Sequence, residues 1–156
     1  MTVRRVVTGH DSAGRSTILI DEEVDPTQTP SSTVAQLWVA EQAPVSNEGF
    51  EDLSHRPLSL QPPPGGSQIW IVTIPPKGEG EHLSNINDLN RHTTATIDYM
   101  IVLQGELCLF LDDGRTVLKP QDVVVQRGTA HAWENSGTEP VVLAVILIDA
   151  VPLEAR

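Results

Sequence analysis

The stretch that decides the fold is HTTATIDYMIVLQG, residues 92–105, and a related stretch follows at residues 121–135, QDVVVQRGTAHAWEN. Each stretch combines one histidine with a run rich in valine and isoleucine, and each contains a glycine. Branched side chains in short runs are typical of β-strands. Residues 112–114, Asp-Asp-Gly, lie between the two stretches and predict a tight hairpin, because glycine relieves the positive φ of such turns.

Short apolar runs separated by proline and glycine continue through the rest of the chain. We expect strands at Arg4–Thr8, Ser16–Ile20, Thr33–Ala40, Gln68–Ile74, Ile97–Leu103, Leu107–Leu111, Arg115–Leu118, Asp122–Gln126, His131–Asn135 and Val141–Ile148. The first two flank a polar loop between Gly9 and Gly14, which predicts an N-terminal β-hairpin. Short strands with frequent turns and no amphipathic helix predict an all-β domain, either a sandwich or a barrel of antiparallel strands.

The length of 156 residues fits a single domain. Residues 43–66 are rich in proline, glycine, serine and acidic residues, and we expect a long surface loop or a covering arm there. On this interpretation residues 1–66 form a hairpin, a strand and a loop arm that pack on a barrel core formed by residues 67–156. A hairpin outside the minimal barrel also favours a homodimer, because pairing protects an exposed sheet edge.

From residue 75 to 148 the chain resembles the cupin superfamily, whose members carry two motifs. The first motif runs His-x-His, a short gap, Glu, six residues and Gly. His92, Asp98 and Gly105 follow this spacing, with Thr94 at the position of the second histidine and aspartate in place of glutamate. The resemblance implies a cupin-type double-stranded β-helix, a jelly-roll barrel, with the N-terminal hairpin added to it.

The second motif of the cupins runs Gly-Asp, a short strand, Pro-x-Gly-x-x-His, three residues and Asn. Here Gly128, His131 and Asn135 match the second half of the motif. Gln121 and Gln126 replace its first glycine and its proline, and the stretch before the turn is one residue shorter. The two motifs together, with the hairpin between them, make the resemblance specific over about half of the chain.

The resemblance implies a metal site inside the barrel, formed by His92, Asp98 and His131. Two imidazoles and one carboxylate leave coordination positions open for water, oxygen or substrate. The arrangement suits a divalent metal such as Fe, and Mn, Ni or Zn also fit it. Such a metal acts as a Lewis acid toward an oxygen of a small substrate. The opposite interpretation is a metal-free barrel in which both histidines are structural, since Thr94 removes one ligand of the family.

Four further residues are candidates for substrate binding, and each has a structural alternative. Thr94 shares a strand face with His92 and is expected to hydrogen-bond to a metal-bound water. Arg127 suits bidentate pairing with a substrate carboxylate, or a surface salt bridge. Trp133 forms a pocket wall or packs in the core. His82 replaces the missing ligand, gates the barrel mouth or lies in a solvated loop.

The formal net charge of −11 disfavours nucleic acid and anionic membranes as partners. The first residues lack an apolar signal core and no apolar run approaches membrane-spanning length, so we expect a cytoplasmic protein. Cys108 lies in an apolar run and is expected in the core.

These features together predict a metal-dependent enzyme that acts on a small oxygenated or carboxylated organic molecule. Oxygenase, decarboxylase and isomerase activities occur in the family that the chain resembles, and the residues do not choose among them. The alternative is a non-catalytic, metal-free barrel that binds a small ligand. The two hypotheses differ in the metal content of the purified protein.

Overall fold

The computed structural model describes residues 2–77 and 91–153 of the chain. These residues form strands, turns and loops, so the all-β expectation is confirmed, and no helix among them is long and apolar enough to cross a membrane. The strands are β1 (Val3–His10), β2 (Ser16–Val24), β3 (Thr27–Gln28), β4 (Thr33–Ala40), β5 (Ser67–Ile74), β6 (Thr96–Gln104), β7 (Leu107–Leu111), β8 (Arg115–Leu118), β9 (Val123–Arg127), β10 (His131–Glu134) and β11 (Val141–Asp149).

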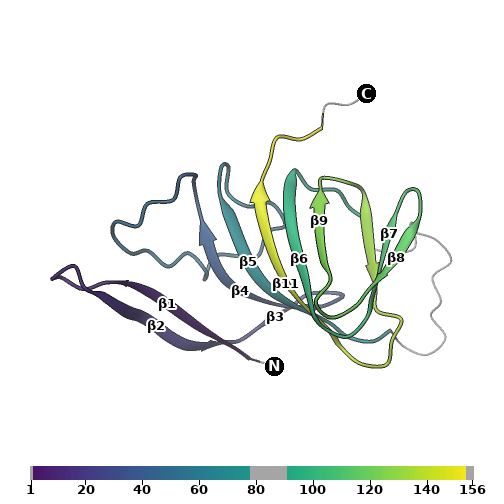
Figure 1. Ribbon diagram of the computed structural model, residues 1–156, viewed down its shortest axis with the longest axis horizontal. Helices are drawn as coiled ribbons and strands as arrows, with labels where there is room; N and C mark the ends of the chain where they lie inside the picture. Colours follow the sequence, from purple (N-terminus) through teal and green to yellow (C-terminus); the bar gives the residue numbers. More distant parts are fainter. Residues whose placement is uncertain (1, 78–90, 154–156) are drawn as a thin grey trace.

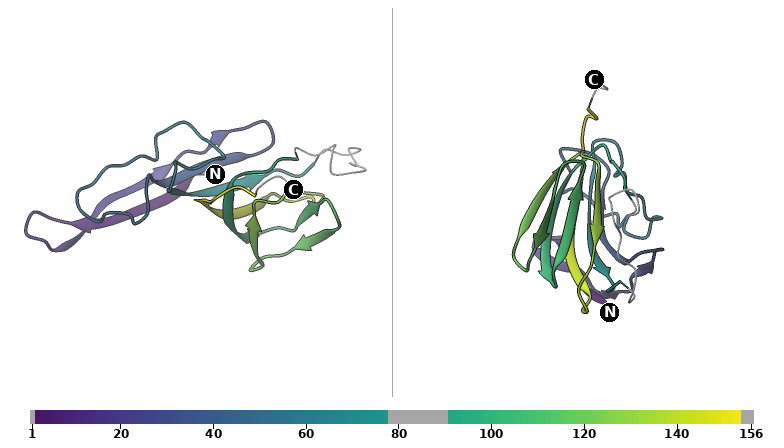
Figure 2. Two further views of the ribbon diagram at one scale, coloured as in Figure 1. Left: turned by 90° about the horizontal axis from the view of Figure 1, so that it is seen from above. Right: turned by 90° about the vertical axis from the view of Figure 1, so that its right-hand side faces the viewer.

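The strands form three antiparallel sheets (Figure 1). The largest sheet has the order β3-β4-β5-β11-β6-β9, the second has the order β10-β7-β8, and β1 pairs with β2 alone. The strands β3 and β4 lie within residues 1–66, so this segment contributes to the barrel wall as well as the hairpin and the loop. Figure 2 shows the β1–β2 hairpin extending away from the barrel, on the side opposite β7 and β8.

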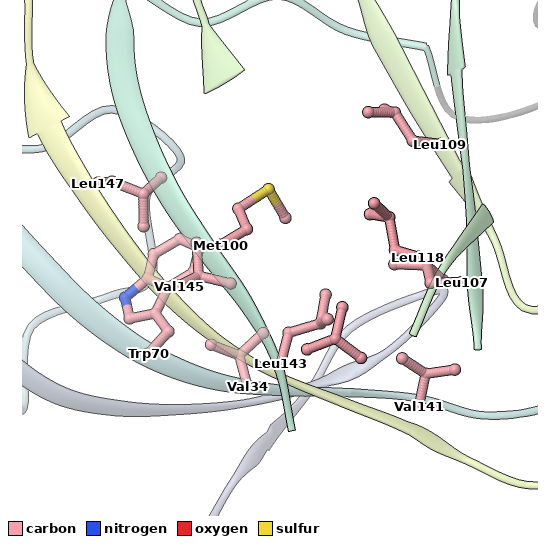
Figure 3. Packing of buried hydrophobic residues seen from close by; sticks show 11 residues of the cluster. Val34, Trp70, Met100, Leu107, Leu109, Leu118, Val141, Leu143, Val145 and Leu147 are labelled. Carbon is pink, nitrogen blue, oxygen red and sulfur yellow. The ribbon is translucent and has the colours of Figure 1, made fainter. Parts of the chain in front are cut away.

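The core lies between the six-stranded and the three-stranded sheets (Figure 3). Along β11 every second side chain is buried, as the period of a half-buried strand requires. Trp70, Met100 and Leu147 come from the large sheet and face Leu107 and Leu118 from the small one. Burying one such apolar side chain contributes about 1.5–3 kcal/mol. The same alternation of apolar side chains that predicts the strands therefore also provides the buried contacts that hold the two sheets together.

The two motif glycines are required by the backbone. Gly105 has φ of 80°, and a Cβ atom there would lie 2.9 Å from Cγ2 of Val141. Gly128 has φ of 56°, and its Cβ would lie 3.3 Å from the carbonyl oxygen of Thr94. A side chain at either position would require an unfavourable left-handed backbone conformation and would also lie too close to a neighbouring atom. The turn at Gly128 thus packs directly beside the segment that leads from His92 into β6.

Arg5 of β1 ties the hairpin to the rest of the chain. Its side chain is buried, and its guanidinium donates to the carbonyl oxygen of Leu37 at 2.9 Å and to Oγ of Ser54 at 2.6 Å. The same group donates to Oδ2 of Asp52 at 2.6 Å and to the carboxylate of Glu22. One side chain of the hairpin therefore meets β4, the loop after β4 and the partner strand β2.

Candidate functional site

The barrel encloses an open cavity of about 740 Å³. Its apolar wall includes Val34, Leu58, Trp70, Met100, Val145 and Leu147, and its polar groups include those of His92, Asp98, His131 and Asn135. A cavity of this volume, mostly apolar with a few convergent polar groups, is typical of a small-molecule site. The three residues that the sequence predicts as metal ligands therefore all line this one cavity.

His92 and His131 lie opposite each other in an isolated antiparallel bridge. The N–H of each residue donates to the carbonyl oxygen of the other at 3.1 Å. Residues paired in this way present their side chains on the same face of the sheet. The two ring centroids are 4.4 Å apart with an interplanar angle of 60°. The backbone therefore fixes the two imidazoles as a contacting pair at the cavity.

The imidazole of His131 is oriented by a backbone carbonyl. Its Nδ1 lies 2.8 Å from the carbonyl oxygen of Thr129. Because a carbonyl oxygen only accepts, Nδ1 carries the proton, and in the neutral ring Nε2 then holds a free lone pair. Burial lowers the pKa of His131, which favours the neutral ring. Metal-binding histidines commonly have their second nitrogen held in this way.

Gln126 supports the same arrangement, although it is absent from the site residues expected from the sequence. Its side-chain amide donates to the carbonyl oxygen of Thr129 at 3.3 Å and also to the hydroxyl of that residue. Gln126 is buried and pairs with Asp98 across β9 and β6, so its side chain points inward. It stands where the second cupin motif has proline, and alternation along β9 is the signal that would have identified it.

Asp98 is the buried carboxylate of the site. Asp98 is only 5% exposed, and its Oδ1 has no hydrogen-bond partner among the described residues. Burial raises the pKa of Asp98, while a hydrogen bond from Thr96 and the nearby His92 oppose the rise. An unpaired carboxylate oxygen at this depth is costly, so a proton, a metal or a ligand group would stabilise it.

Thr94 acts on Asp98 through Thr96. The hydroxyl oxygens of the two threonines are 2.7 Å apart, and the buried Thr96 hydroxyl hydrogen-bonds to Asp98. Thr94 is not among the described residues that line the cavity, so the structure does not bring it to the position expected for a partner of metal-bound water. The alternation His92, Thr94, Thr96, Asp98 in the sequence is the signal that would have identified Thr96.

The remaining residues expected from the sequence lie in different places relative to the cavity. Trp133 lines the cavity, and its ring centroid lies 5.8 Å from that of His131. Arg127 is exposed and pairs with Ile97, whereas its neighbour Gln126 faces inward, so the structure does not bring Arg127 into the cavity. His82 lies outside the described residues.

The donor types at the cavity suit a divalent metal, but they are not assembled around one point. Among residues 2–77 and 91–153, no three His, Cys, Asp or Glu side chains are grouped closely enough to hold an ion. The unpaired Oδ1 of Asp98 and the oriented imidazole of His131 are the two features that fit a metal site.

A family model described as the cupin domain, Cupin_2, matches residues 70–147. The chain is also similar to the phomopsin biosynthesis cluster protein C' of Diaporthe leptostromiformis, with 33% identity over 98% of this chain and 82% of that protein. It is similar to the cupin-domain-containing oxidoreductase fogC of Aspergillus ruber, with 30% identity over 94% of this chain and 72% of that protein.

Two solved structures share the fold. The cupin domain of Schizosaccharomyces pombe Cnp3 aligns with a TM-score of 0.55 and 14% identity, over 94% of this chain and 87% of that one. AerE from Microcystis aeruginosa aligns with a TM-score of 0.51 and 16% identity, over 84% of this chain and 48% of that one. At this level of identity the likeness concerns the fold alone.

Proposed function

This chain belongs to the cupin family, and from that premise we propose that it is a metal-dependent enzyme acting on a small, largely apolar organic molecule with an oxygen-containing group. One observation carries the proposal. The pair His92 and His131 and the Asp98 carboxylate, whose Oδ1 has no hydrogen-bond partner in the described part of the chain, share a single cavity whose wall is otherwise mostly apolar.

The names of similar proteins support an enzyme of this kind. The protein fogC is named a cupin-domain-containing oxidoreductase, as is virC of Hypocrea virens, which is 28% identical over 97% of this chain. The Diaporthe protein is named as a member of a biosynthesis cluster. These names favour a reaction on a small organic molecule, and the chain spans most of the length of each of these relatives.

The residues of the chain have distinct parts in this proposal. His92, Asp98 and His131 would hold the metal, which when bound supplies Lewis-acid or redox chemistry. Burial lowers the pKa of His131 and so favours the neutral imidazole, the form that ligates. The apolar wall around Trp70 and Met100 binds the body of the substrate and excludes water from its reacting end.

A metal-free binding protein is the second candidate, and one observation favours it. The described residues contain no ready cluster of three ligands. Burial also raises the pKa of Asp98, so a protonated Asp98 would donate a hydrogen bond to a ligand oxygen in the same cavity. In this alternative the two histidines position the ligand without a metal.

The test is the metal content of the purified protein, measured by mass spectrometry after incubation with Fe(II), Mn(II), Ni(II) or Zn(II) and removal of excess ion. We expect close to one ion per chain of the preferred metal. His131→Ala and Asp98→Ala should each weaken retention at least tenfold, because each removes one of three ligands. His10→Ala, in the exposed part of the hairpin, is the control. A parent protein that retains none of the four metals contradicts the proposal and favours the metal-free candidate.

A further inference from the structure

The loop between β4 and β5 supplies part of the cavity wall (Figure 1). We name this loop, residues 41–66, the arm. Three consecutive residues of the arm, Leu58, Ser59 and Leu60, line the cavity together with Trp70 of β5. Leu58 also packs against the buried core, so it lies where the arm meets the barrel. The arm is therefore part of the site and not only of the surface.

The arm lies outside residues 70–147, the part of the chain that the cupin model matches. The structure describes the whole arm, and it contains no helix or strand. The prolines at 57 and at 62–64 lack the N–H that a strand ladder requires. Loops of more than about 12–15 residues without secondary structure are uncommon within a domain and are usually functional. This portion of the cavity wall is thus an addition to the shared domain.

Two buried glutamines hold the arm on either side of Leu58. The side-chain amide of Gln36 on β4 donates to the carbonyl oxygen of Arg56 at 2.9 Å. The side-chain amide of Gln68 on β5 donates to the carbonyl oxygen of Ser59 at 2.6 Å. A buried amide that loses its partners destabilises the fold, so both glutamines favour the docked arm. The backbone around Leu58 is therefore fixed before any ligand binds.

The end of the arm is tied to the segment that leads into β6. The side-chain amide of Gln61 donates to the carbonyl oxygen of Ala95 at 3.1 Å, and the N–H of Ala95 donates to Oε1 of Gln61 at 3.2 Å. The same amide donates to Oδ1 of Asp149 at 2.9 Å, and the N–H of Gly65 donates to Oδ2 of Asp149 at 2.7 Å. Ala95 lies between the two threonines that support Asp98. The arm and the polar groups of the cavity are therefore held in one framework.

We propose that the arm is the substrate-recognition element of the cavity and that Leu58 binds the apolar body of the substrate. This inference rests on the proposed function, because it assigns the same cavity to the substrate. The substrate class that follows has one oxygen-containing end for His131 and Asp98 and an apolar body large enough to contact Leu58 as well. The cavity of about 740 Å³ has room for such a body. A wall that is fixed in advance strengthens binding, because little conformational freedom is lost on contact.

The experiment measures the binding of phenol, naphthol and hydroxypyrene to the intact protein in the presence of a chelator. The three probes share one hydroxyl group and differ in the size of the apolar body. Tryptophan emission reports binding, because Trp70 and Trp133 line the cavity. Burial of apolar surface strengthens binding by about fourfold for each CH₂ group. The affinity of the parent protein should therefore rise from phenol to hydroxypyrene.

Leu58→Ala removes three carbon atoms from the wall and should weaken hydroxypyrene binding by about tenfold or more. It should leave phenol binding unchanged, because phenol is too small to contact the polar groups and Leu58 together. Leu58→Met keeps the volume and the apolar character of the side chain and should retain the parent affinities. Leu53→Ala is the matched control, since Leu53 belongs to the arm but is not among the described residues that line the cavity.

Leu60→Ala gives a second measurement that does not depend on a core contact. Leu60 lines the cavity and is 51% exposed, so the fold should tolerate its truncation. We expect a smaller loss of hydroxypyrene affinity than in Leu58→Ala, again with phenol binding unchanged. Thermal melting of each variant separates a change at the cavity wall from a loss of the fold.

Equal hydroxypyrene affinities of the parent, Leu58→Ala and Leu60→Ala would overturn the inference. It is also overturned by a parent protein that binds none of the three probes, or by an equal loss of phenol and hydroxypyrene binding in Leu58→Ala. Metal content is measured on the same preparations without chelator. If the arm variants discriminate between the probes in a protein that retains no metal, the result supports the arm and contradicts only the metal-dependent function.

Discussion

At the scale of single residues, two short hydrogen-bond chains hold the polar groups of the cavity. The hydroxyls of Thr94 and Thr96 lead to Asp98 on β6, and the amide of Gln126 supports the carbonyl oxygen that orients His131. A buried polar group without such partners would destabilise the fold by about 1–3 kcal/mol. Thr94 and Gln126 stand where the cupin motifs have histidine and proline. In the structure they thus act as positioning residues.

Gln121 is a residue in a conformation that suits glycine. Its φ is 78°, and it follows Pro120 in a turn closed by a hydrogen bond of 2.9 Å from the N–H of Asp122 to the carbonyl oxygen of Lys119. A type II turn requires positive φ at this third position, where glycine has no steric penalty. The second cupin motif has glycine here.

We predict that Gln121→Gly raises the free energy of unfolding by about 0.5–1 kcal/mol, because it relieves the left-handed conformation. Urea denaturation measures the change. Gln121→Ala is the matched control, since it removes the same side chain but keeps a Cβ atom at positive φ, and it should give no increase. Equal effects of the two substitutions would show that the side chain, and not the backbone, decides the difference.

At the scale of elements, the hairpin depends on one buried cation. Burial opposes ionisation of Asp52, but hydrogen bonds from Arg5 and from the backbone N–H and hydroxyl of Ser54 outweigh it and lower the pKa of Asp52 to about 2. This carboxylate therefore contributes stability above pH 3.8, on the order of 2 kcal/mol, and the contribution is lost as the pH falls toward 2. A two-stranded hairpin is marginal by itself, so this contact fixes its place.

Arg5→Met should lower the free energy of unfolding by about 3 kcal/mol or more, because it leaves Asp52 buried without its cation. Arg4→Met is the control on the same strand, since Arg4 pairs with Asp21 at the surface, where water and salt screen the attraction and such pairs contribute little to stability. Urea denaturation at pH 7 measures both variants. Similar losses for Arg4→Met and Arg5→Met would contradict the role of the buried cation.

The strands could be predicted from the sequence, and much of the site with them, but the register between strands could not. Alternation and turn residues locate every described strand except the two-residue β3 to within a few residues, and the motif spacing brings His92, Asp98 and His131 to one cavity. The expectation for Arg127 depends on register, because a shift of one residue exchanges the two faces of a strand. In the structure Gln126 pairs with Asp98, so Gln126 and not Arg127 faces inward.

At the scale of the whole molecule, the burial of ionisable side chains in the cavity costs the fold stability at the pH values where those side chains are charged. Burial raises the pKa of Asp98, so the folded protein binds this proton more tightly than the unfolded chain does. The contribution of Asp98 to stability is therefore greatest below pH 3.8 and decreases as the pH rises from 3.8 through the raised pKa. Burial lowers the pKa of His131, so its contribution has the opposite sign and decreases as the pH falls below 6.5.

We predict that Asp98→Asn stabilises the metal-free protein at neutral pH by on the order of 1 kcal/mol, because it removes a buried charge whose Oδ1 has no hydrogen-bond partner among the described residues, while it keeps the shape of the side chain. Thermal melting between pH 4.5 and 8 in the presence of a chelator measures the effect. The parent should lose stability with rising pH relative to the variant, so the difference between them grows toward pH 8. Asp113→Asn, at the exposed turn between β7 and β8, should follow the parent at every pH. A uniform loss of stability in Asp98→Asn would mean that the carboxylate has a stabilising partner in the folded protein.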